Sequence, residues 1–222
     1  MAASWSLIIP QKDLRLAKSR MALPDHQRRR LVLAMLDDTL TAVLGSAAVR
    51  SAIIVCDNQH DVSLLSRPEV ITHINRLGGG QNIAVEVGAA FARGRLPGTD
   101  VAVLPADLPG LRSAELTRAL ELARQHARSF VRDASGSGTT LLTATNGHDL
   151  LAGYGPFSGA VHALSGAVEI GAGAHIESLC DDVDDLAALR AVAGQACGTR
   201  TRRAYAELAA ADHLEPSAMA PC

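Results

Sequence analysis

The chain has 222 residues and a formal net charge of −2 at neutral pH, from 21 basic and 23 acidic side chains. This balance gives no electrostatic basis for binding nucleic acid or an anionic membrane, so neither is expected as a partner. Hydrophobic residues make up 48% of the chain but aromatic residues only 3%, which predicts a core of Ala, Leu, Val and Ile.

The N-terminus lacks a charged segment followed by a long apolar stretch, and no run approaches the roughly 20 apolar residues that span a membrane. The four cysteines form no CxxC pair, so neither a disulfide framework nor a zinc site is indicated. They are Cys56, Cys180, Cys197 and Cys222. A cytoplasmic protein with reduced thiols is expected.

Apolar runs and helical patterns alternate along the chain. Short apolar runs predict buried strands at residues 6–10, 51–56, 70–74 and 101–104, with shorter strands at 130–131 and 140–143. Helical patterns are predicted at residues 25–44, 82–93, 113–126, 157–164 and 183–193. In the first helix Asp25 is predicted to cap the start and Gly45 to end the pattern. The basic run 28–30 is interpreted as a solvated face.

Strands that are apolar on both faces and alternate with helices indicate an α/β fold with a mainly parallel sheet covered on both sides. No repeat, low-complexity linker or domain boundary is evident. Residues 1–215 are therefore expected to form one domain, with 216–222 as a frayed tail.

Lysine occurs only twice, and Lys12 and Lys18 both lie in the polar segment 10–20 after the first predicted strand. Lysine is a compact charge suited to phosphate chains, whereas arginine is a planar fork suited to carboxylates. Lys12, Lys18 and Arg20 could surround a triphosphate, although a codon bias against lysine leaves the same pattern. Neither a Walker A motif nor GxGxxG occurs, so the common nucleotide fingerprints do not apply.

Acidic residues follow the fourth predicted strand and precede the last predicted helix. Asp107 is either a metal ligand or the cap of the turn into the next helix. The cluster 181–185 places favourable charge at a helix N-terminus, which requires no metal. Because Mg²⁺ is held by one or two carboxylates together with substrate phosphates, the two clusters together favour a Mg²⁺ site. Ligands of open parallel sheets bind at this carboxyl edge.

Three glycine-rich segments are candidates for contacts to an anion. Segment 136–140 offers small residues and hydroxyls, and 153–158 leads into a helix start whose N–H groups point outward. Segment 78–80 precedes Asn82 and a helix, a placement that fits a nucleotide-binding loop as well as a flexible turn. Ordinary turn chemistry is an alternative for each. His162 lies within the helix after the second segment, and no acid–base role is assigned to it.

Seven short motifs, taken in chain order, resemble the guanylyltransferases of coenzyme F-420 biosynthesis, which activate 2-phospholactate or phosphoenolpyruvate with GTP. The motifs are Ile9-Pro10-x-Lys12 with Ala17-Lys18-Ser19-Arg20, Ala34-Met35-Leu36-x-Asp38-Thr39-Leu40, Gly80-x-Asn82-x-Ala84, Ala106-Asp107-Leu108-Pro109, Gly138-Thr139-Thr140-Leu141-Leu142, Gly155-x-x-Ser158 with His162, and Asp182-Val183-Asp184. The resemblance runs from about Leu7 to Leu189 and implies a Rossmann-like nucleotidyltransferase fold.

The resemblance implies three groups of site residues. The GTP phosphates would be held by three cations that are also catalytic, Lys12, Lys18 and Arg20. Two further residues would lie close to the nucleotide, Gly80 and Asn82. Mg²⁺ would be held by the carboxylates of Asp107, Asp182 and Asp184. Asp107 would also be catalytic. The phosphorylated acid would be bound by Thr139, Gly155 and Ser158.

The chain departs from the family pattern at a few of these motifs. Relatives often have Arg before the His of the Gly-x-x-Ser segment, where this chain has Val161. In the acidic segment Asp185 replaces a usual Thr, and Ala188 replaces a usual Asp. The loss of the Arg leaves the identity of the acid open.

The implied reaction is attack by the phosphate of phosphoenolpyruvate on the α-phosphorus of GTP, with release of pyrophosphate. That phosphate is largely dianionic at neutral pH, so no general base is needed. The product would pass to a transferase of the deazaflavin pathway.

Phosphoenolpyruvate is preferred because the chain resembles the Ala- and Arg-rich bacterial members. Open alternatives are 2-phospho-L-lactate, 3-phosphoglycerate, a sugar phosphate or molybdopterin as acceptor, and a GTP-binding protein without turnover. The oligomeric state is not predicted.

Overall fold

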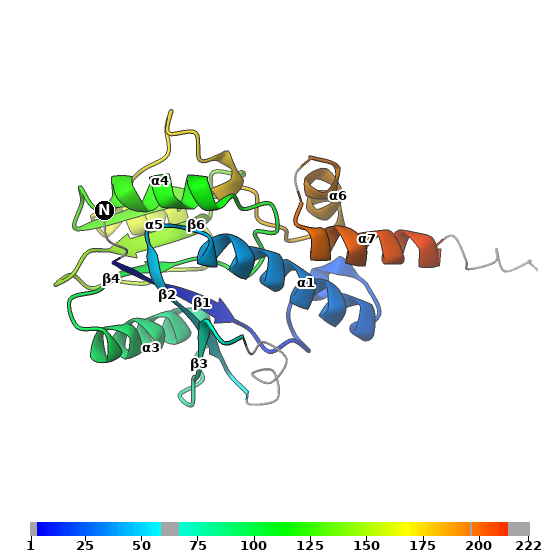
Figure 1. Ribbon diagram of the computed structural model, residues 1–222, viewed down its shortest axis with the longest axis horizontal. Helices are drawn as coiled ribbons and strands as arrows, with labels where there is room; N and C mark the ends of the chain where they lie inside the picture. Colours follow the sequence, from blue (N-terminus) through cyan, green and yellow to red (C-terminus); the bar gives the residue numbers. More distant parts are fainter. Residues whose placement is uncertain (1–3, 59–66, 196, 213–222) are drawn as a thin grey trace, which may run out of the picture.

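Seven strands form one sheet in the order β3-β2-β1-β4-β6-β5-β7, in a computed structural model that describes residues 4–58, 67–195 and 197–212 (Figure 1). The strands are β1 (Trp5–Gln11), β2 (Val49–Cys56), β3 (Val70–Ile74), β4 (Asp100–Val103), β5 (Arg128–Arg132), β6 (Thr139–Ala144) and β7 (Val168–Glu169). Strand β6 is antiparallel to its neighbours β4 and β5, whereas all other pairs are parallel. The predicted α/β fold with a mainly parallel sheet is confirmed.

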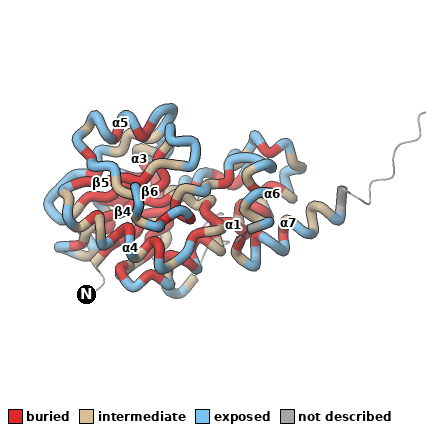
Figure 2. Tube along the Cα trace, turned by 90° about the horizontal axis from the view of Figure 1, so that it is seen from above, coloured by how far each residue is buried: buried red, intermediate tan, exposed pale blue. Residues whose placement is uncertain are grey.

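Helices cover both faces of this sheet, which explains why the central strands are apolar throughout. The helices are α1 (Asp25–Leu44), α3 (Gly80–Arg95), α4 (Ser113–Ala123), α5 (Ser158–Leu164), α6 (Leu186–Gln195) and α7 (Thr199–Asp212), with short 3-10 helices η1 (Ser19–Met21) and η2 (Glu177–Leu179). Helices α1 and α4 lie on one face, and α3 and α5 on the other (Figure 2). In strand β1, which has neighbours on both sides, Leu7, Ile8 and Ile9 are fully buried.

Helix α3 packs very closely on the sheet at Gly88. A Cβ atom at this position would lie 2.7 Å from Ile8 Cγ2 and 2.8 Å from Val55 Cγ2, so any larger residue would push the helix away. The close approach fixes the start of α3 beside the carboxyl ends of β1 and β2.

Helix α1 has the predicted bounds, but its predicted cap is wrong. Pro24 occupies the capping position and makes no side-chain cap, while Asp25 is the first helical residue. The Asp25 carboxylate pairs with Arg28 at 2.6 Å, one turn along the helix. At the other end Gly45 donates its N–H to Thr41 and ends the helix as predicted.

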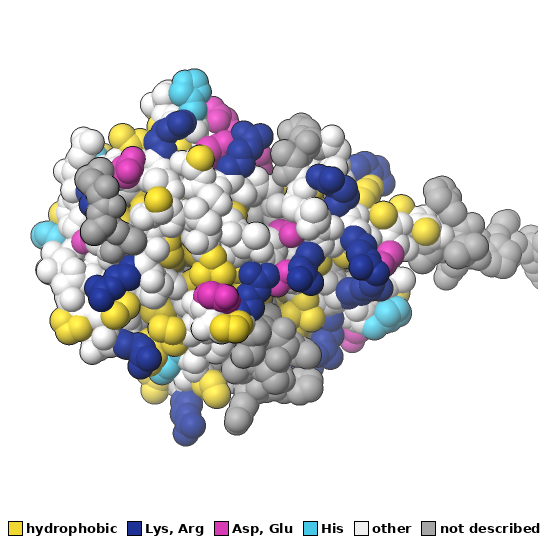
Figure 3. Space-filling model, viewed as in Figure 1, with side chains coloured by type: hydrophobic (Ala, Val, Ile, Leu, Met, Phe, Trp, Pro, Cys, Tyr) yellow, Lys and Arg dark blue, Asp and Glu magenta, His cyan; other side chains and the backbone are white. Residues whose placement is uncertain are grey.

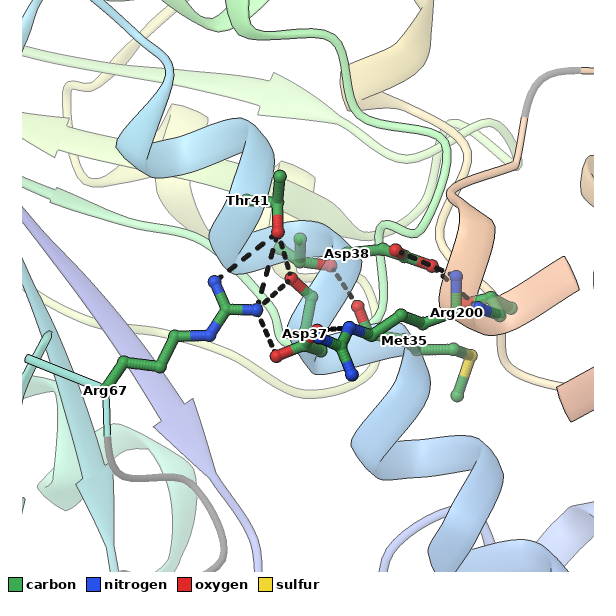
Figure 4. A network of polar contacts seen from close by, with 8 residues as sticks. Met35, Asp37, Asp38, Thr41, Arg67 and Arg200 are labelled. Atoms are coloured by element: carbon green, nitrogen blue, oxygen red, sulfur yellow. Dashed lines mark hydrogen bonds and ion pairs between the residues drawn. The ribbon is translucent and has the colours of Figure 1, made fainter. Parts of the chain in front are cut away.

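The C-terminal region differs most from the predictions. Helix α6 begins three residues later than predicted, and α7 and the two-residue strand β7 were not predicted. Helix α7 is polar, so its pattern gives little signal, and its N-terminus is capped from a distance. Asp38 of α1 accepts hydrogen bonds from the backbone N–H groups of Arg200 (3.3 Å) and Thr201 (2.7 Å) (Figure 4).

Two further expectations concern the chain as a whole. The predicted tail at 216–222 lies outside the described residues. Cys56, Cys180 and Cys197 form no disulfide within the described residues, and Cys222 lies outside them. Within the part of the chain that the structure describes, every helix is too short or too polar to cross a membrane.

Candidate functional site

A cavity of about 670 Å³ opens at the carboxyl edge of the sheet, where β1, β2 and β4 end. Its walls come from the loop after β1, from α1, from the start of α3 and from the turn after β4. The lining residues include Gln11, Lys12, Lys18, Arg20, Asp57, Gly80, Gln81, Asp107 and Asp184. Five residues predicted for the site, Asn82, Thr139, Gly155, Ser158 and Asp182, do not line it.

The loop after β1, which carries both lysines, is held by a buried arginine. Arg28 is only 5% exposed, and its guanidinium donates to the backbone carbonyls of Ala17 (2.5 Å) and Arg15 (2.9 Å). Leu14, Ala17 and Met21 anchor the same loop in a small core against α1. The prediction that 28–30 is a solvated face is therefore wrong for Arg28, because its charge is satisfied by loop carbonyls and by Asp25.

Lys18 is the charged centre of the site. Its backbone adopts the left-handed conformation (φ 53°, ψ 37°), which is uncommon outside glycine and turns the side chain inward. Its ammonium contacts the carboxylates of Asp107 and Asp184, the latter at 2.6 Å. Burial opposes the charged form of Lys18, but the two carboxylates outweigh it and raise the pKa. Lys18 is therefore a fixed cation.

Asp107 is placed by hydrogen bonds to its own backbone and to the next residue. Thr39 of α1 donates its hydroxyl to the Met35 carbonyl (2.9 Å) and accepts the N–H of Leu108 (3.2 Å). The Asp107 carbonyl accepts the N–H of Val183 (3.0 Å), which brings the acidic segment 181–185 beside the turn. The alternative that Asp107 caps the next helix is not realised, because Arg112 occupies the capping position of α4.

The acidic segment divides into separate roles. Asp185 accepts the N–H of Ala188 (2.8 Å) at the start of α6, as expected of a helix-terminal acid. Asp184 contacts Lys18. Burial, and then the charges of Asp107 and Asp184, raise the pKa of Asp182 to about 7. Negative charge therefore accumulates around Asp107 beyond what Lys18 neutralises.

These carboxylates fit a hard divalent cation, although they are not assembled as a finished site. No group of three or more His, Cys, Asp or Glu side chains in the described ranges is arranged to hold a metal ion, and Lys18 lies between Asp107 and Asp184. Oxygen Oδ1 of Asp107 is buried and has no hydrogen-bond partner among the described residues. An unpartnered carboxylate oxygen next to excess negative charge matches the ligands that Mg²⁺ prefers.

Thr139 starts the antiparallel strand β6, so it lies at the same edge of the sheet as the carboxyl ends of the parallel strands. Nε2 of His162 accepts the backbone N–H of Gly153 (3.0 Å), which leaves the ring hydrogen on Nδ1 to donate to Thr139 Oγ1 (2.9 Å). Burial, and then the charge of Arg128, lower the pKa of His162 to about 4. His162 is neutral at physiological pH and is a positioning residue for Thr139.

The loops around Thr139 are joined to each other. Asp133 shapes the turn before Thr139 by accepting the N–H groups of Ser137 (3.0 Å) and Gly138 (2.9 Å). At the start of α5, the N–H of Ser158 bonds to Gly155 (3.2 Å) and the N–H of Gly159 to Ser137 (3.1 Å). These two N–H groups are used within the protein, so they are not the outward donors that the sequence led us to expect.

Asn82 links the two sides of the site instead of facing the cavity. Its amide donates to the Tyr154 carbonyl (3.0 Å) and accepts the Tyr154 N–H (2.8 Å), a two-way bond between α3 and segment 153–158. The glycine run before it is required by the backbone, because Gly78, Gly79 and Gly80 all have positive φ angles of 64°, 84° and 79°.

Sequence reasoning missed Gln11, Arg28, Thr39 and Asp57 as residues of the site. Thr39 lay within a motif of the family resemblance, which was a usable signal. Gln11 is the last residue of β1, and Asp57 directly follows β2. This position at the carboxyl edge of the sheet is the signal that could have found them.

A second cavity, of about 740 Å³, lies between α1, α7 and Arg67. Arginine side chains gather around α1 and α7 (Figure 3). Arg67 and Arg200 share the Asp37 carboxylate (Figure 4). Arg30 and Arg203 share the Glu207 carboxylate. These ion pairs hold α7 against α1, so we interpret the second cavity as part of the packing interface between the two helices. The first cavity is therefore the candidate site.

Comparison with known proteins shows the family of the chain. A family model described as "Guanylyl transferase CofC like" matches residues 5–176. The chain belongs to this family. A phosphoenolpyruvate guanylyltransferase of Streptomyces avermitilis is 43% identical over 92% of this chain and 95% of its own length. One of Thermomonospora curvata is 41% identical over 93% and 91%.

Solved structures share the fold at low sequence identity. A putative nucleotide-diphospho-sugar transferase from Desulfovibrio desulfuricans superposes with a TM-score of 0.67 at 13% identity, covering 96% of each chain. A nucleotidyl transferase from Methanothermobacter thermautotroptrophicus gives a TM-score of 0.55 at 18% identity, covering 85% of this chain and 95% of its own. The sheet is therefore of the Rossmann-like nucleotidyltransferase type.

Proposed function

We propose that this CofC-like protein transfers GMP from GTP to the phosphate of phosphoenolpyruvate and releases pyrophosphate, in coenzyme F-420 biosynthesis. The supporting observation is the identity of 40–43% with curated phosphoenolpyruvate guanylyltransferases of Streptomyces across 92% of the chain. The guanosine diphosphate-linked acid formed would be consumed by a transferase acting on a deazaflavin precursor.

The GTP phosphates would be held by cations of the loop after β1. Lys12 and Arg20 are exposed, line the cavity and make no ion pair among the described residues, so their charges are available to a ligand. Lys18 carries a fixed charge beside Asp107. Three cations on one wall would offset the charge that develops on departing pyrophosphate.

Asp107, Asp182 and Asp184 would hold Mg²⁺. The unpartnered Oδ1 of Asp107 and the raised pKa of Asp182 support this assignment. When bound, the ion would neutralise charge on the phosphates and orient them for displacement.

The phospho-acid would bind at the β6 side of Asp107, where Thr139, Gly155 and Ser158 lie. The Thr139 hydroxyl accepts from His162, so its own proton is free to donate to an anion. The acid's phosphate is largely dianionic at pH 7, and it attacks the α-phosphorus without a general base. His162 is neutral and is hydrogen-bonded at both ring nitrogens, which agrees with a mechanism based on positioning and charge neutralisation.

The test is pyrophosphate release from GTP and Mg²⁺ with phosphoenolpyruvate, 2-phospho-L-lactate or 3-phosphoglycerate, for wild type and Asp107→Asn. We expect turnover with phosphoenolpyruvate and a loss of at least about 100-fold in Asp107→Asn, because the isosteric amide removes one charge from the site. Asp149→Asn, on a carboxylate outside the cavity, is the matched control. Full activity of Asp107→Asn would remove the metal assignment.

The same assay separates the other candidate functions. Turnover only with 2-phospho-L-lactate or 3-phosphoglycerate would reassign the acid, and turnover only with a sugar phosphate or molybdopterin would reject the proposal. Tight GTP binding without pyrophosphate from any acceptor would indicate a nucleotide-binding protein. Val161, which packs against Gly153 in the acid-side loop, is the residue to exchange for Arg if the acid is reassigned.

A further inference from the structure

The polar character of the cavity changes along the sheet edge. Strand β2 lies on the opposite side of β1 from β4, so Asp57, after β2, is separated from Asp107, after β4, by the end of β1. The Asp107 side carries Lys18, whereas the β2 side presents hydrogen-bond acceptors. A nucleotide with its phosphates at the lysines would extend its base toward Asp57.

Gln11 provides a buried acceptor at this end of the cavity. It is the last residue of β1 and only 4% exposed, and its Nε2 donates to the Lys12 carbonyl (2.7 Å). Its Oε1 is buried and has no hydrogen-bond partner among the residues that the structure describes. A buried acceptor without a donor costs free energy, and a donor supplied by a ligand removes that cost.

Asp57 provides a second acceptor, and it is held in place. The buried Asn75 donates its amide to Asp57 Oδ1 (3.2 Å) and to the Gly78 carbonyl (3.1 Å). Its own N–H bonds to the Cys56 carbonyl (2.8 Å). Asn75 therefore fixes the Asp57 carboxylate relative to the glycine turn at the start of α3. No hydrogen bond or ion pair of the second oxygen, Oδ2, is formed within the described ranges, and Asp57 lines the cavity.

We propose that Asp57 and Gln11 select guanine. Oxygen Oδ2 of Asp57 accepts hydrogen bonds from the guanine N1–H and from one hydrogen of its 2-amino group, and Oε1 of Gln11 accepts the other 2-amino hydrogen. Guanine alone among the common bases presents two adjacent donor groups on this edge, whereas adenine and cytosine place a ring acceptor beside their amine. That ring acceptor would face a carboxylate oxygen and be repelled. A site built around fixed acceptors, of which Gln11 is buried, rejects a base that cannot supply the donors. This inference rests on the proposed use of GTP.

The test is nucleotide binding to the full chain in Mg²⁺ without any phospho-acid, using GTP, inosine triphosphate, xanthosine triphosphate and ATP. Inosine lacks the 2-amino group, and xanthine has a carbonyl in its place. We expect the wild type to bind GTP about 10- to 100-fold more tightly than the inosine nucleotide, as for loss of a hydrogen bond to a charged group. ATP should bind more weakly than GTP.

Asp57→Asn keeps the shape of the side chain and its bond to Asn75 but replaces an acceptor by a donor. It should weaken GTP binding about 10- to 100-fold and make the xanthosine nucleotide the preferred one, since the new amide can donate to the xanthine 2-carbonyl. Asp149→Asn is the control of equal charge change and should keep the wild-type order. Unchanged nucleotide preference in Asp57→Asn would overturn the inference, as would equal wild-type affinity for GTP and ATP.

Gln11→Leu should reduce the preference for GTP over the inosine nucleotide, and an unchanged preference in the folded variant would exclude Gln11. If that variant does not fold, the Asp57→Asn preference alone decides. Selective GTP binding without pyrophosphate release would refute the proposed function and leave this inference standing. Equal turnover with GTP and the other purine nucleotides would overturn guanine selection and leave the proposed transfer to phosphoenolpyruvate standing.

Discussion

Burial of neutral His162 predicts a loss of stability on mild acidification. His162 is fully buried, with both ring nitrogens bonded to the protein and a pKa of about 4 instead of the usual 6.5. In the unfolded chain the ring takes up a proton below pH 6.5, whereas the folded protein resists this until pH 4. The contribution of neutral His162 to the free energy of unfolding is therefore fully present above about pH 7.5. It is lost progressively as the pH falls from there toward the folded-state pKa of about 4.

The size of the effect follows from the two pKa values. The full difference corresponds to about 3 kcal/mol, of which about 2 kcal/mol is lost between pH 8 and pH 5. The assay is urea unfolding of wild type and His162→Gln at both pH values. Wild type should lose about 2 kcal/mol more than the variant, which cannot titrate. His175→Gln, at an exposed histidine, should behave as wild type. Equal losses in wild type and His162→Gln would refute the reasoning.

Three other substitutions separate binding from folding. Lys12→Ala should raise the KM for GTP about tenfold with unchanged urea unfolding, because this exposed side chain has no ion-pair partner among the described residues; a fall in stability would contradict a phosphate role. Arg28→Ala should lower the free energy of unfolding by about 2 kcal/mol, since two loop carbonyls lose charge-assisted donors; Arg29→Ala is its control. Thr139→Val should raise the KM for the acid about tenfold and leave the KM for GTP unchanged, while Thr139→Ser keeps both near wild type; equal shifts in both KM values would argue against acid binding.

Local patterns were sufficient for most of the fold. Helix α1 has its predicted bounds because twenty residues repeat apolar side chains with a helical period, between Pro24 and Gly45. The strands β1 to β4 were found from apolar runs because both faces of the sheet are covered. Polar helix α7 was missed because its N-terminus is capped by Asp38, more than 160 residues earlier in the chain.

Contacts between distant segments explain what was wrong or missed in the site. Arg28 belongs to a basic run that is typical of a solvent-exposed face, and only the path of the loop after β1 places carbonyls around it. The amide of Asn82 bonds to Tyr154, 72 residues later, which no local pattern predicts; its closeness to the nucleotide stays a prediction. The meeting of Lys18 with Asp107 did follow from sequence, because both segments come directly after parallel strands. Their roles toward GTP and metal remain predictions.

The direction of β6 decides how two substrates could meet at one edge. Had β6 been parallel to β4, its first residue, Thr139, would lie at the opposite edge of the sheet from Asp107. As an antiparallel strand it begins where β4 ends, so Asp107 shares that edge with Thr139 and the loops proposed to bind the acid. The cavity proposed to hold the nucleotide extends from Asp107 in the other direction, over β1 to β2. A phosphate approaching from the β6 side would therefore face the nucleotide across Asp107, with the loop cations on the far side to receive pyrophosphate. In-line displacement requires this order of attacking and leaving groups.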